Sequence, residues 1–158
     1  MAQAESVTQI QRHLEQLLRM SASRRVYANQ AETAGVVMSQ PAYVLLRCIS
    51  QDGPLPMGEL ARRAHMDAGA TARQVGQLER DGLVRRYASS EDGRVNLVVV
   101  TPPGLRVHQR LASVLHGHMV GVLAQWSEKD RQDFAKLMGR FVEDLRESNY
   151  PAVEAASS

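Results

Sequence analysis

The sequence has a single cysteine and no long apolar run, and each scarcity excludes a class of structure. Cys48 is the only cysteine, so no disulfide can form within the chain, which fits a reducing compartment. No stretch approaches the roughly 20 apolar residues that a membrane span needs, and the opening MAQAESVTQIQRHLEQLL has no apolar core of signal-peptide length. We therefore expect a soluble, cytoplasmic protein that has no membrane partner.

Aromatic residues make up only 4% of the 158 residues, whereas hydrophobic residues make up 44% and charged residues 23%. This composition supports a packed core in a single domain and argues against bulk disorder. An independent core of this size usually contains more aromatic side chains. The scarcity fits a core that a partner chain completes as well as a core that one chain closes by itself.

The motifs that mark common enzymes are also missing. The sequence has no glycine-rich phosphate loop, no Gly-x-Ser-x-Gly elbow and no Cys-x-x-Cys. His116 and His118 point about 200° apart on a helix, and His108 lies two turns from His116, so these histidines do not predict a metal site. We expect no catalytic residue, no metal and no cofactor.

Helical apolar spacing dominates both ends of the chain. Val7 to Met20 predicts one amphipathic helix that continues to about residue 29. A long helix is expected to begin at Thr101–Gly104 and to run to Trp126, and a last one carries Phe134 to Leu145 after Ser127, which resembles a cap. These apolar stripes exceed what a small central unit can cover, although a compact monomer is the alternative. We interpret 1–30 and 105–148 as dimerisation helices and expect 151–158 to be disordered.

The middle of the chain predicts a different unit. Ser39 or Gln40 is expected to cap a helix ending near Asp52–Pro54, and a short helix Met57–His65 should follow. Asp67 should cap a helix from Ala68 to Asp81, with Gly82 as its left-handed end. The stretch GLVRRYASSEDGRVNLVVVTPPG then predicts a β-hairpin around Asp-Gly. The expected fold is mainly α with a small β-hairpin: a winged helix-turn-helix lobe over 39–104.

Charge is concentrated in this lobe. The net charge of the whole chain is only +2 and its pI is about 9.0. Arginine suits phosphate and guanine because its planar fork donates two hydrogen bonds at once. The segment 62–94 contains no lysine but seven arginines: Arg62, Arg63, Arg73, Arg80, Arg85, Arg86 and Arg94.

The segment from Glu59 to Gly104 resembles the DNA-binding lobe of the MarR (multiple antibiotic resistance regulator) family. The matching residues are Leu60-Ala61, Leu78-Glu79, Gly82-Leu83-Val84 with Arg86, Asp92-x-Arg94, Leu97 and Thr101-x-x-Gly104. The flanking helices fall where that family places its dimerisation region. Ala72 stands where the family often has threonine before Arg73, and Gly76-Gln77 replaces a frequent Asp-Arg pair, so the operator sequence cannot be carried over.

The resemblance and the arginine pattern together predict the DNA contacts. Arg73 and Gln77 are the expected base readers, with Gln74 and Arg80 near phosphates. Arg94 is expected in the minor groove, held by Asp92. One of Arg85 and Arg86 should face DNA phosphates while the other pairs internally, and the resemblance favours Arg86 as the residue nearer DNA or its support. Thr71 is also expected to pack inward with Val75 and Leu78. The full predicted set is Gly69, Thr71, Arg73, Gln74, Gln77, Arg80, Arg86, Ser90, Asp92 and Arg94.

In relatives, ligands lie between the dimer helices and the DNA-binding lobe. The matching region here predicts an effector site, for a small aromatic or phenolic compound, formed by Met20, Met38, Tyr43, Arg47 and Met66. Methionines adapt to varied apolar shapes, and Arg47 suits a carboxylate. Peroxide-sensing relatives carry their cysteine in the first helix, whereas Cys48 lies in the second predicted helix, so we expect an inert thiol.

The leading hypothesis is a homodimeric transcription regulator that binds a pseudo-palindromic double-stranded operator. We expect it to act as a repressor rather than an activator. One alternative is a ligand-binding helical dimer or enzyme-like module that does not bind DNA. Another is an interaction protein whose wing contacts protein. DNA binding through several phosphates weakens steeply with salt, which separates the first hypothesis from the others.

Overall fold

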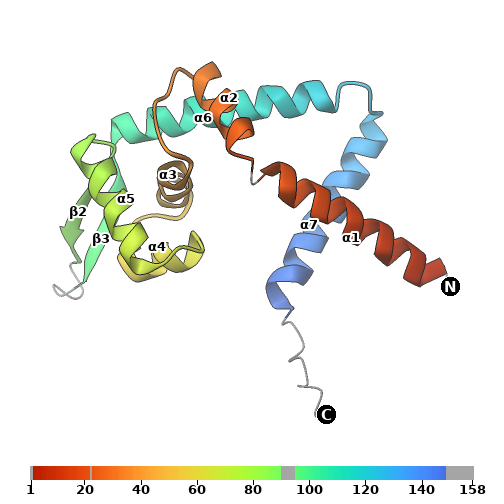
Figure 1. Ribbon diagram of the computed structural model, residues 1–158, viewed down its shortest axis with the longest axis horizontal. Coiled ribbons are helices and arrows are strands. Elements are labelled where there is room, and N and C mark those ends of the chain that lie inside the picture. Colours follow the sequence, from red (N-terminus) through yellow and green to blue (C-terminus); the bar gives the residue numbers. More distant parts are fainter. Residues whose placement is uncertain (1, 22, 90–94, 149–158) are drawn as a thin grey trace, which may run out of the picture. The chain divides into compact units, whose positions relative to one another are not determined.

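The computed structural model describes residues 2–21, 23–89 and 95–148 (Figure 1). The chain divides into two compact units, Met1–His116 and Gly117–Ser158, each of which is described by itself. The elements in order are α1 (Ala2–Ser21), α2 (Arg24–Thr33), α3 (Gln40–Asp52), β1 (Leu55–Pro56), α4 (Met57–Arg63), α5 (Ala68–Arg80), β2 (Val84–Ala88), β3 (Asn96–Val100), α6 (Pro102–Val122) and α7 (Glu128–Glu147). The predicted class, mainly α with a small β element, is confirmed.

The helices of the central lobe begin at side-chain caps. The Ser39 hydroxyl accepts a hydrogen bond from the Ala42 backbone N–H (3.3 Å) at the start of α3, where Pro41 occupies the first turn. Asp67 Oδ1 accepts from the Ala70 N–H at 2.7 Å and starts α5. Each cap satisfies a backbone donor that a helix start leaves without an intrahelical partner. Both predicted caps are therefore confirmed.

The end of α5 is set by a glycine. Gly82 has φ +70°, a conformation that costs other residues free energy. Its N–H donates to the Glu79 carbonyl (3.0 Å), and the Leu83 N–H donates to the Leu78 carbonyl (2.9 Å). This pair of bonds closes the helix and turns the chain directly into β2. The predicted left-handed helix end at Gly82 is confirmed.

The sheet has three antiparallel strands in the order β1-β3-β2. Val84 pairs with Val100 and Ala88 with Asn96, so β2 and β3 have the register of the predicted hairpin, whose turn at 90–94 lies outside the described residues. In β1, Leu55 pairs with Val98. The sequence did not predict β1, because two residues after Gly53-Pro54 are too short to show strand alternation.

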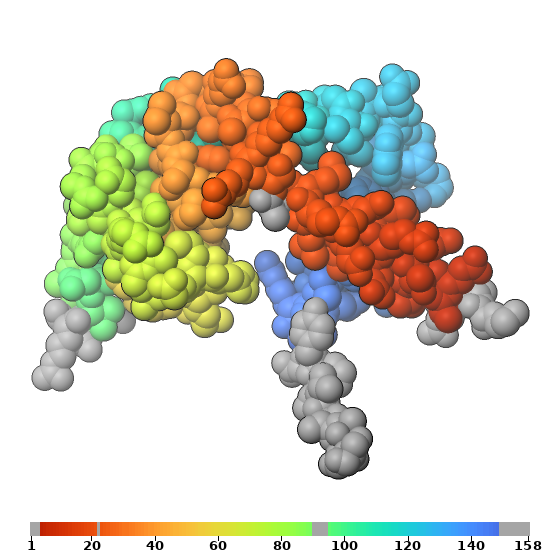
Figure 2. All heavy atoms as spheres, in the orientation of Figure 1, coloured from red at the N-terminus to blue at the C-terminus, as the bar shows by residue number. Residues whose placement is uncertain are grey.

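The main core lies where α3, α4, α5 and the sheet meet, and Figure 1 shows these elements grouped together. In the space-filling view, the atoms of α4 lie directly against those of α5 (Figure 2). A second cluster, Ala31, Val36, Tyr43 and Leu111, joins α2 and α3 to α6. The main core consists of Ala42, Leu45, Leu46, Ile49, Leu55, Leu60, Val75, Leu78, Val84 and Val98.

Two expected helix boundaries are wrong. The first helix does not continue to residue 29 but ends at Ser21, and α2 begins at Arg24. Serines compete for backbone hydrogen bonds: the Ser21 hydroxyl donates to the Leu18 carbonyl, and the Ser23 N–H donates to the Met20 carbonyl. Similarly, α6 ends at Val122, four residues before Trp126, and the turn is held by Arg131 Nη1 donating to the Trp126 carbonyl at 2.7 Å.

Large apolar side chains remain exposed on the helices at the chain ends. On α1 they include Val7, Ile10, Leu17 and Leu18, each more than half exposed. None of the described residues of α7 is buried, and Leu137 is 62% exposed. No helix in the described part of the chain combines the length and apolar character needed to cross a membrane.

Candidate nucleic-acid interface

The helix α5 presents two distinct faces. Thr71, Val75 and Leu78 are each at most 1% exposed and anchor one face in the core. The opposite face carries Gly69, Arg73, Gln77 and Arg80, all exposed. The exposed side chains combine arginine and glutamine, which are the residue types that read guanine and adenine edges in a major groove.

Thr71 belongs to the buried face. Its hydroxyl donates to the Asp67 carbonyl at 2.8 Å, within the first turn of α5. The predicted inward packing is thereby confirmed, and the side chain retains almost no surface with which to meet DNA. We therefore leave Thr71 out of the contact set that we propose below.

Near the end of α5, the exposed side chains are joined to one another by hydrogen bonds. Arg80 Nη2 donates to Gln77 Oε1 at 2.7 Å, and Gln77 Nε2 donates to Asp81 Oδ1 at 2.9 Å. Arg73 has no ion pair or side-chain hydrogen bond with any residue that the structure describes. Arg73 thus has no partner among the described residues, whereas both ends of the Gln77 amide are engaged, each with one further hydrogen bond to offer.

Gln74 is connected to another helix. Its Oε1 accepts from the hydroxyl of Ser39 at 3.2 Å, and Ser39 also caps α3. The bond joins the start of α3 to the middle of α5, 35 positions later in the chain. Ser39 was predicted only as a helix cap, because nothing in local spacing indicates a contact between residues so far apart.

The strand β2 separates its two arginines. Arg86 lies beside α5: its Nε is 3.3 Å from Glu79 Oε2, and its backbone N–H donates to Glu79 Oε1 at 3.2 Å. Arg85 points to the other side, with its guanidinium carbon 5.9 Å from the centre of the Tyr87 ring. Arg86 is therefore the arginine that pairs internally, and Arg85 is the freer one. Ser90, Asp92 and Arg94 lie outside the described residues.

The residues of the predicted effector site are partly brought together. Tyr43 is buried, the Arg47 guanidinium lies 6.0 Å from its ring centre, and Met38 packs beside it. Met66 packs against the main core, and Met20 is 64% exposed on α1. Met38 also lines a cavity of about 450 Å³ with Tyr27 and Arg24 of α2.

Aromatic and ionisable groups surround Tyr43. Its ring stacks on Tyr27 (5.8 Å between centres) and lies 6.3 Å from the His108 ring. Burial, followed by the nearby charge of Arg47, lowers the pKa of His108. His108 Nδ1 is buried and has no hydrogen-bond partner among the residues that the structure describes. Its surroundings, a mixed aromatic cluster of α2, α3 and α6, thus favour the neutral imidazole over the charged one.

Neither a metal site nor a reactive thiol stands out. The described residues contain no group of three or more His, Cys, Asp or Glu placed to hold a metal ion. Cys48 is half-buried, and burial raises the pKa of its thiol, with Arg47 acting in the opposite direction. A raised pKa leaves less of the nucleophilic thiolate at neutral pH, which agrees with an inert cysteine.

Comparison with known proteins identifies the lobe. The model of the MarR family matches residues 38–95. An uncharacterised HTH-type transcriptional regulator of Bacillus subtilis, YxaD, is 31% identical over 120 residues, which cover 74% of this chain and 82% of the relative. An HTH-type transcriptional repressor of Mycobacterium tuberculosis is 29% identical over 68% of this chain and 77% of its own length.

Solved structures agree in fold. A MarR-family transcriptional regulator from Silicibacter pomeroyi superposes with a TM-score of 0.62 at 25% identity, over 80% of this chain and 86% of that one. A MarR-family protein from Bacillus stearothermophilus gives 0.71 at 21% identity, over 89% and 98%. The alternative of an enzyme-like module is therefore wrong. The chain belongs to the MarR family of winged helix-turn-helix, DNA-binding transcription regulators.

Proposed function

We propose that this protein is a cytoplasmic homodimeric repressor that binds a pseudo-palindromic operator and is released by a small aromatic or phenolic effector. The observation that carries the DNA-reading part is the exposed Arg73, which has no partner in the described part of the chain. It lies on a helix that is capped by Asp67 and anchored by three buried side chains. Repression is supported by the relative that is named a repressor.

Dimer formation is supported by the apolar surface of the terminal helices. Leu17 and Leu18 on α1 and Leu137 and Val142 on α7 are between 41% and 62% exposed in the single chain. Large exposed apolar patches commonly mark protein interfaces. A two-fold dimer would place its two α5 helices in major grooves about 10 base pairs apart, or a multiple of that. Arg94 is proposed to enter the flanking minor groove.

The test begins with DNA fragments that the purified protein selects, which are then sequenced to give the operator. Arg73→Ala and Arg80→Ala are compared on the selected duplex and on a scrambled one. We expect Arg73→Ala to cost about 1–3 kcal/mol on the selected duplex and to relax one base position per half-site. Arg80→Ala should weaken both duplexes alike and lower the salt slope by about one.

Arg140→Ala is the matched control, since it removes the same charge from α7, where Arg140 pairs with Asp144. Circular dichroism checks that each variant keeps its helices. If Arg73→Ala and Arg80→Ala lose equal affinity on both duplexes, α5 does not read sequence and the assigned roles are wrong.

The effector part of the proposal has its own test. A panel of aromatic acids is measured for a shift in melting temperature and for release of the operator duplex. We expect active compounds to lose their effect in Arg47→Gln, because the guanidinium near Tyr43 would hold their carboxylate. If no compound shifts the melting temperature or releases DNA, the proposed site around Tyr43 and Arg47 fails.

A further inference from the structure

Two arginine side chains from different elements lie over the bare backbone of Gly76. A β-carbon added at Gly76 would lie 3.6 Å from Nη1 of Arg80, on the same helix, and 3.9 Å from Nη2 of Arg86, on β2. These are ordinary van der Waals distances, so the ends of both guanidiniums border the space that a larger residue would fill. The absence of a side chain at Gly76 therefore lets two cations converge on one spot beside α5.

Each of these guanidiniums is held from its other side. Nη2 of Arg80 donates to Gln77 Oε1 at 2.7 Å, and Nη1 is the nitrogen near Gly76. Nε of Arg86 lies 3.3 Å from Glu79 Oε2, and Nη2 is the nitrogen near Gly76. Within the described part of the chain, neither of the two converging nitrogens donates a hydrogen bond. The neighbours thus orient both side chains and leave these nitrogens available.

The charge of the pair is only partly neutralised. Glu79 offsets the charge of Arg86, whereas the partner of Arg80 is the neutral amide of Gln77. Asp81 accepts a hydrogen bond from Gln77 at 2.9 Å and forms no ion pair with either arginine. Both arginines are exposed, so a positive charge remains at the surface. An anion between the converging nitrogens would gain charge-assisted hydrogen bonds from both sides.

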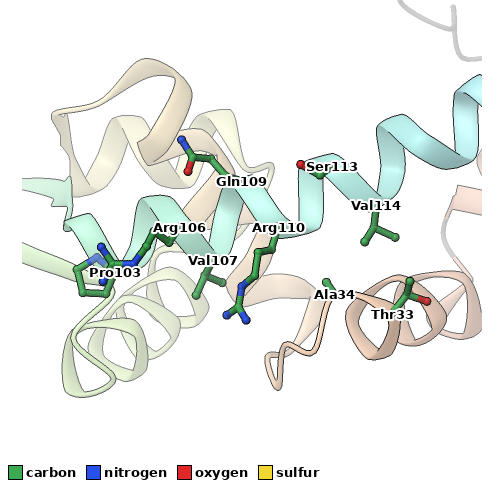
Figure 3. Close-up of a pocket in the computed structure, with 9 residues that line it drawn as sticks. All are labelled: Thr33, Ala34, Pro103, Arg106, Val107, Gln109, Arg110, Ser113 and Val114. Atoms are coloured by element: carbon green, nitrogen blue, oxygen red, sulfur yellow. The ribbon is translucent and has the colours of Figure 1, made fainter.

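Two further arginine pairs in the same unit differ from this arrangement. Arg106 and Arg110 line a cavity of about 850 Å³ beside the end of α2, and Figure 3 shows their side chains pointing in different directions. On α4, two arginines do meet, but the Glu59 carboxylate accepts from both, at 2.7 and 2.6 Å. A β-carbon at Gly76 would meet no carboxylate within 4 Å, only the two nitrogens.

We propose that Arg80 and Arg86 together bind one phosphate of the DNA backbone, and that the missing side chain of Gly76 makes this arginine clamp possible. Because each nitrogen lies within 4 Å of the same point, two oxygens of a single phosphate can bridge them with bonds of about 2.8 Å. Phosphate contacts fix the register of a protein on the duplex. The clamp rests on the proposed operator binding and adds to it a residue, Gly76, that decides how α5 is seated.

An acid at Gly76 tests the clamp. In Gly76→Asp, a carboxylate would stand between the guanidiniums and neutralise them, so affinity for the selected operator duplex should fall about tenfold or more. Gly76→Asn has nearly the same shape without the charge and should lose much less. Gly58→Asp is the matched control, because it adds the same charge to an exposed glycine of α4 where a β-carbon meets no atom within 4 Å. Fluorescence anisotropy of a labelled duplex measures binding, and circular dichroism verifies the helices.

Uncharged phosphate analogues identify the group that the clamp holds. Duplexes in which one phosphate at a time is replaced by methylphosphonate are titrated with the wild-type protein and with Arg80→Gln/Arg86→Gln. We expect one position per half-site at which the wild type loses about tenfold and the double variant loses almost nothing. The double variant should lower the salt slope by about one in total, whereas arginines on separate phosphates would lower it by about two.

The outcomes separate the clamp from the proposed function. If the protein selects no DNA, both fail. If DNA is bound but Gly76→Asp loses no more affinity than Gly58→Asp, the clamp alone is wrong. The clamp is also wrong if Arg80→Gln and Arg86→Gln respond to different methylphosphonate positions. A scan that shows no sensitive position in either protein excludes a backbone phosphate and leaves only a free anion for the two arginines.

Discussion

The central lobe and the terminal helices use apolar residues in opposite ways. In the lobe, Leu45, Leu46 and Leu60 are fully buried within one chain. On α7, the apolar residues recur at the same helical spacing, yet the described part of that helix has no buried residue. The lobe thus closes its own core, whereas α1 and α7 leave apolar side chains exposed, and we propose that a second chain covers them. Equal hydrophobicity in sequence does not imply equal burial in one protomer.

The largest effect is expected from a substitution on α7, which tests whether its exposed apolar side chains form a dimer interface. Burial of a leucine contributes about 1.5–3 kcal/mol, and a two-fold dimer would lose two, so Leu137→Glu should cost about 3–6 kcal/mol of association free energy. Sedimentation equilibrium at micromolar protein should then change from twice the 17.5 kDa chain mass to the monomer mass. Lys136→Glu, which adds an acid beside the apolar stripe, should leave the dimer intact. If the wild-type protein is a monomer, no second chain covers α7, and the contrast between the lobe and the terminal helices is wrong.

The next largest effect belongs to the lobe. Leu46 is 0% exposed in the main core, and Leu46→Ala should destabilise the fold by about 2–5 kcal/mol through lost burial and a residual cavity. Urea unfolding followed by circular dichroism gives the free energy. Leu17→Ala on α1 provides the matched leucine, and its effect should fall as protein concentration is lowered toward the monomer. If Leu46→Ala also depends on concentration in this way, the lobe does not close its own core.

A smaller effect is expected where α5 ends. A side chain at Gly82 would meet no atom within 4 Å, so only its φ of +70° opposes a substitution. Gly82→Ala should therefore cost about 1 kcal/mol, mostly as backbone strain. Gly117→Ala, in open space and at an ordinary helical position, should be neutral or stabilising by comparison. Thermal unfolding of the two variants measures the difference, and equal melting temperatures would disprove the strain.

The smallest effect concerns pH. The pKa of His108 is lowered in the folded chain, so below the ordinary value near 6.5 the unfolded chain binds more protons. Stability should therefore fall as pH decreases through 6.5 toward the folded pKa, and should level off below that value. His108→Gln should flatten this slope, whereas His13→Gln on the exposed face of α1 should not. Urea unfolding between pH 5 and 7.5 measures the slopes, and an unchanged slope in His108→Gln excludes the effect.

Local signals were sufficient for much of the fold. Caps at Ser39 and Asp67, and the glycine at Gly82, place α3 and α5 because each acts on backbone groups within four residues. The break between Ser21 and Arg24 was missed because the apolar pattern continues across it; the bonds found there run from the Ser21 hydroxyl and the Ser23 backbone N–H to the last turn of α1. The strand β1 exists only through its pairing with β3, a contact about 40 positions away.

For the candidate site, too, local periodicity predicted some features, whereas contacts between distant elements could not be predicted. The faces of α5 follow from helical periodicity, so Arg73 and Gln77 were placed correctly on the exposed side. The partner of Arg86 depended on which side of β2 lies against α5, and sequence alternation leaves that choice open.

The bond between Ser39 and Gln74 limits what this glutamine can recognise. With its oxygen held by the Ser39 hydroxyl, the Gln74 amide turns its N–H₂ group away from Ser39. To read adenine, a glutamine amide must donate one hydrogen bond to N7 and accept another from the N6 amino group. A phosphate oxygen only accepts. While Ser39 engages one lone pair of that oxygen, we propose that Gln74 donates its N–H₂ to a phosphate oxygen, and we expect Ser39→Ala to free the whole amide for pairing with adenine.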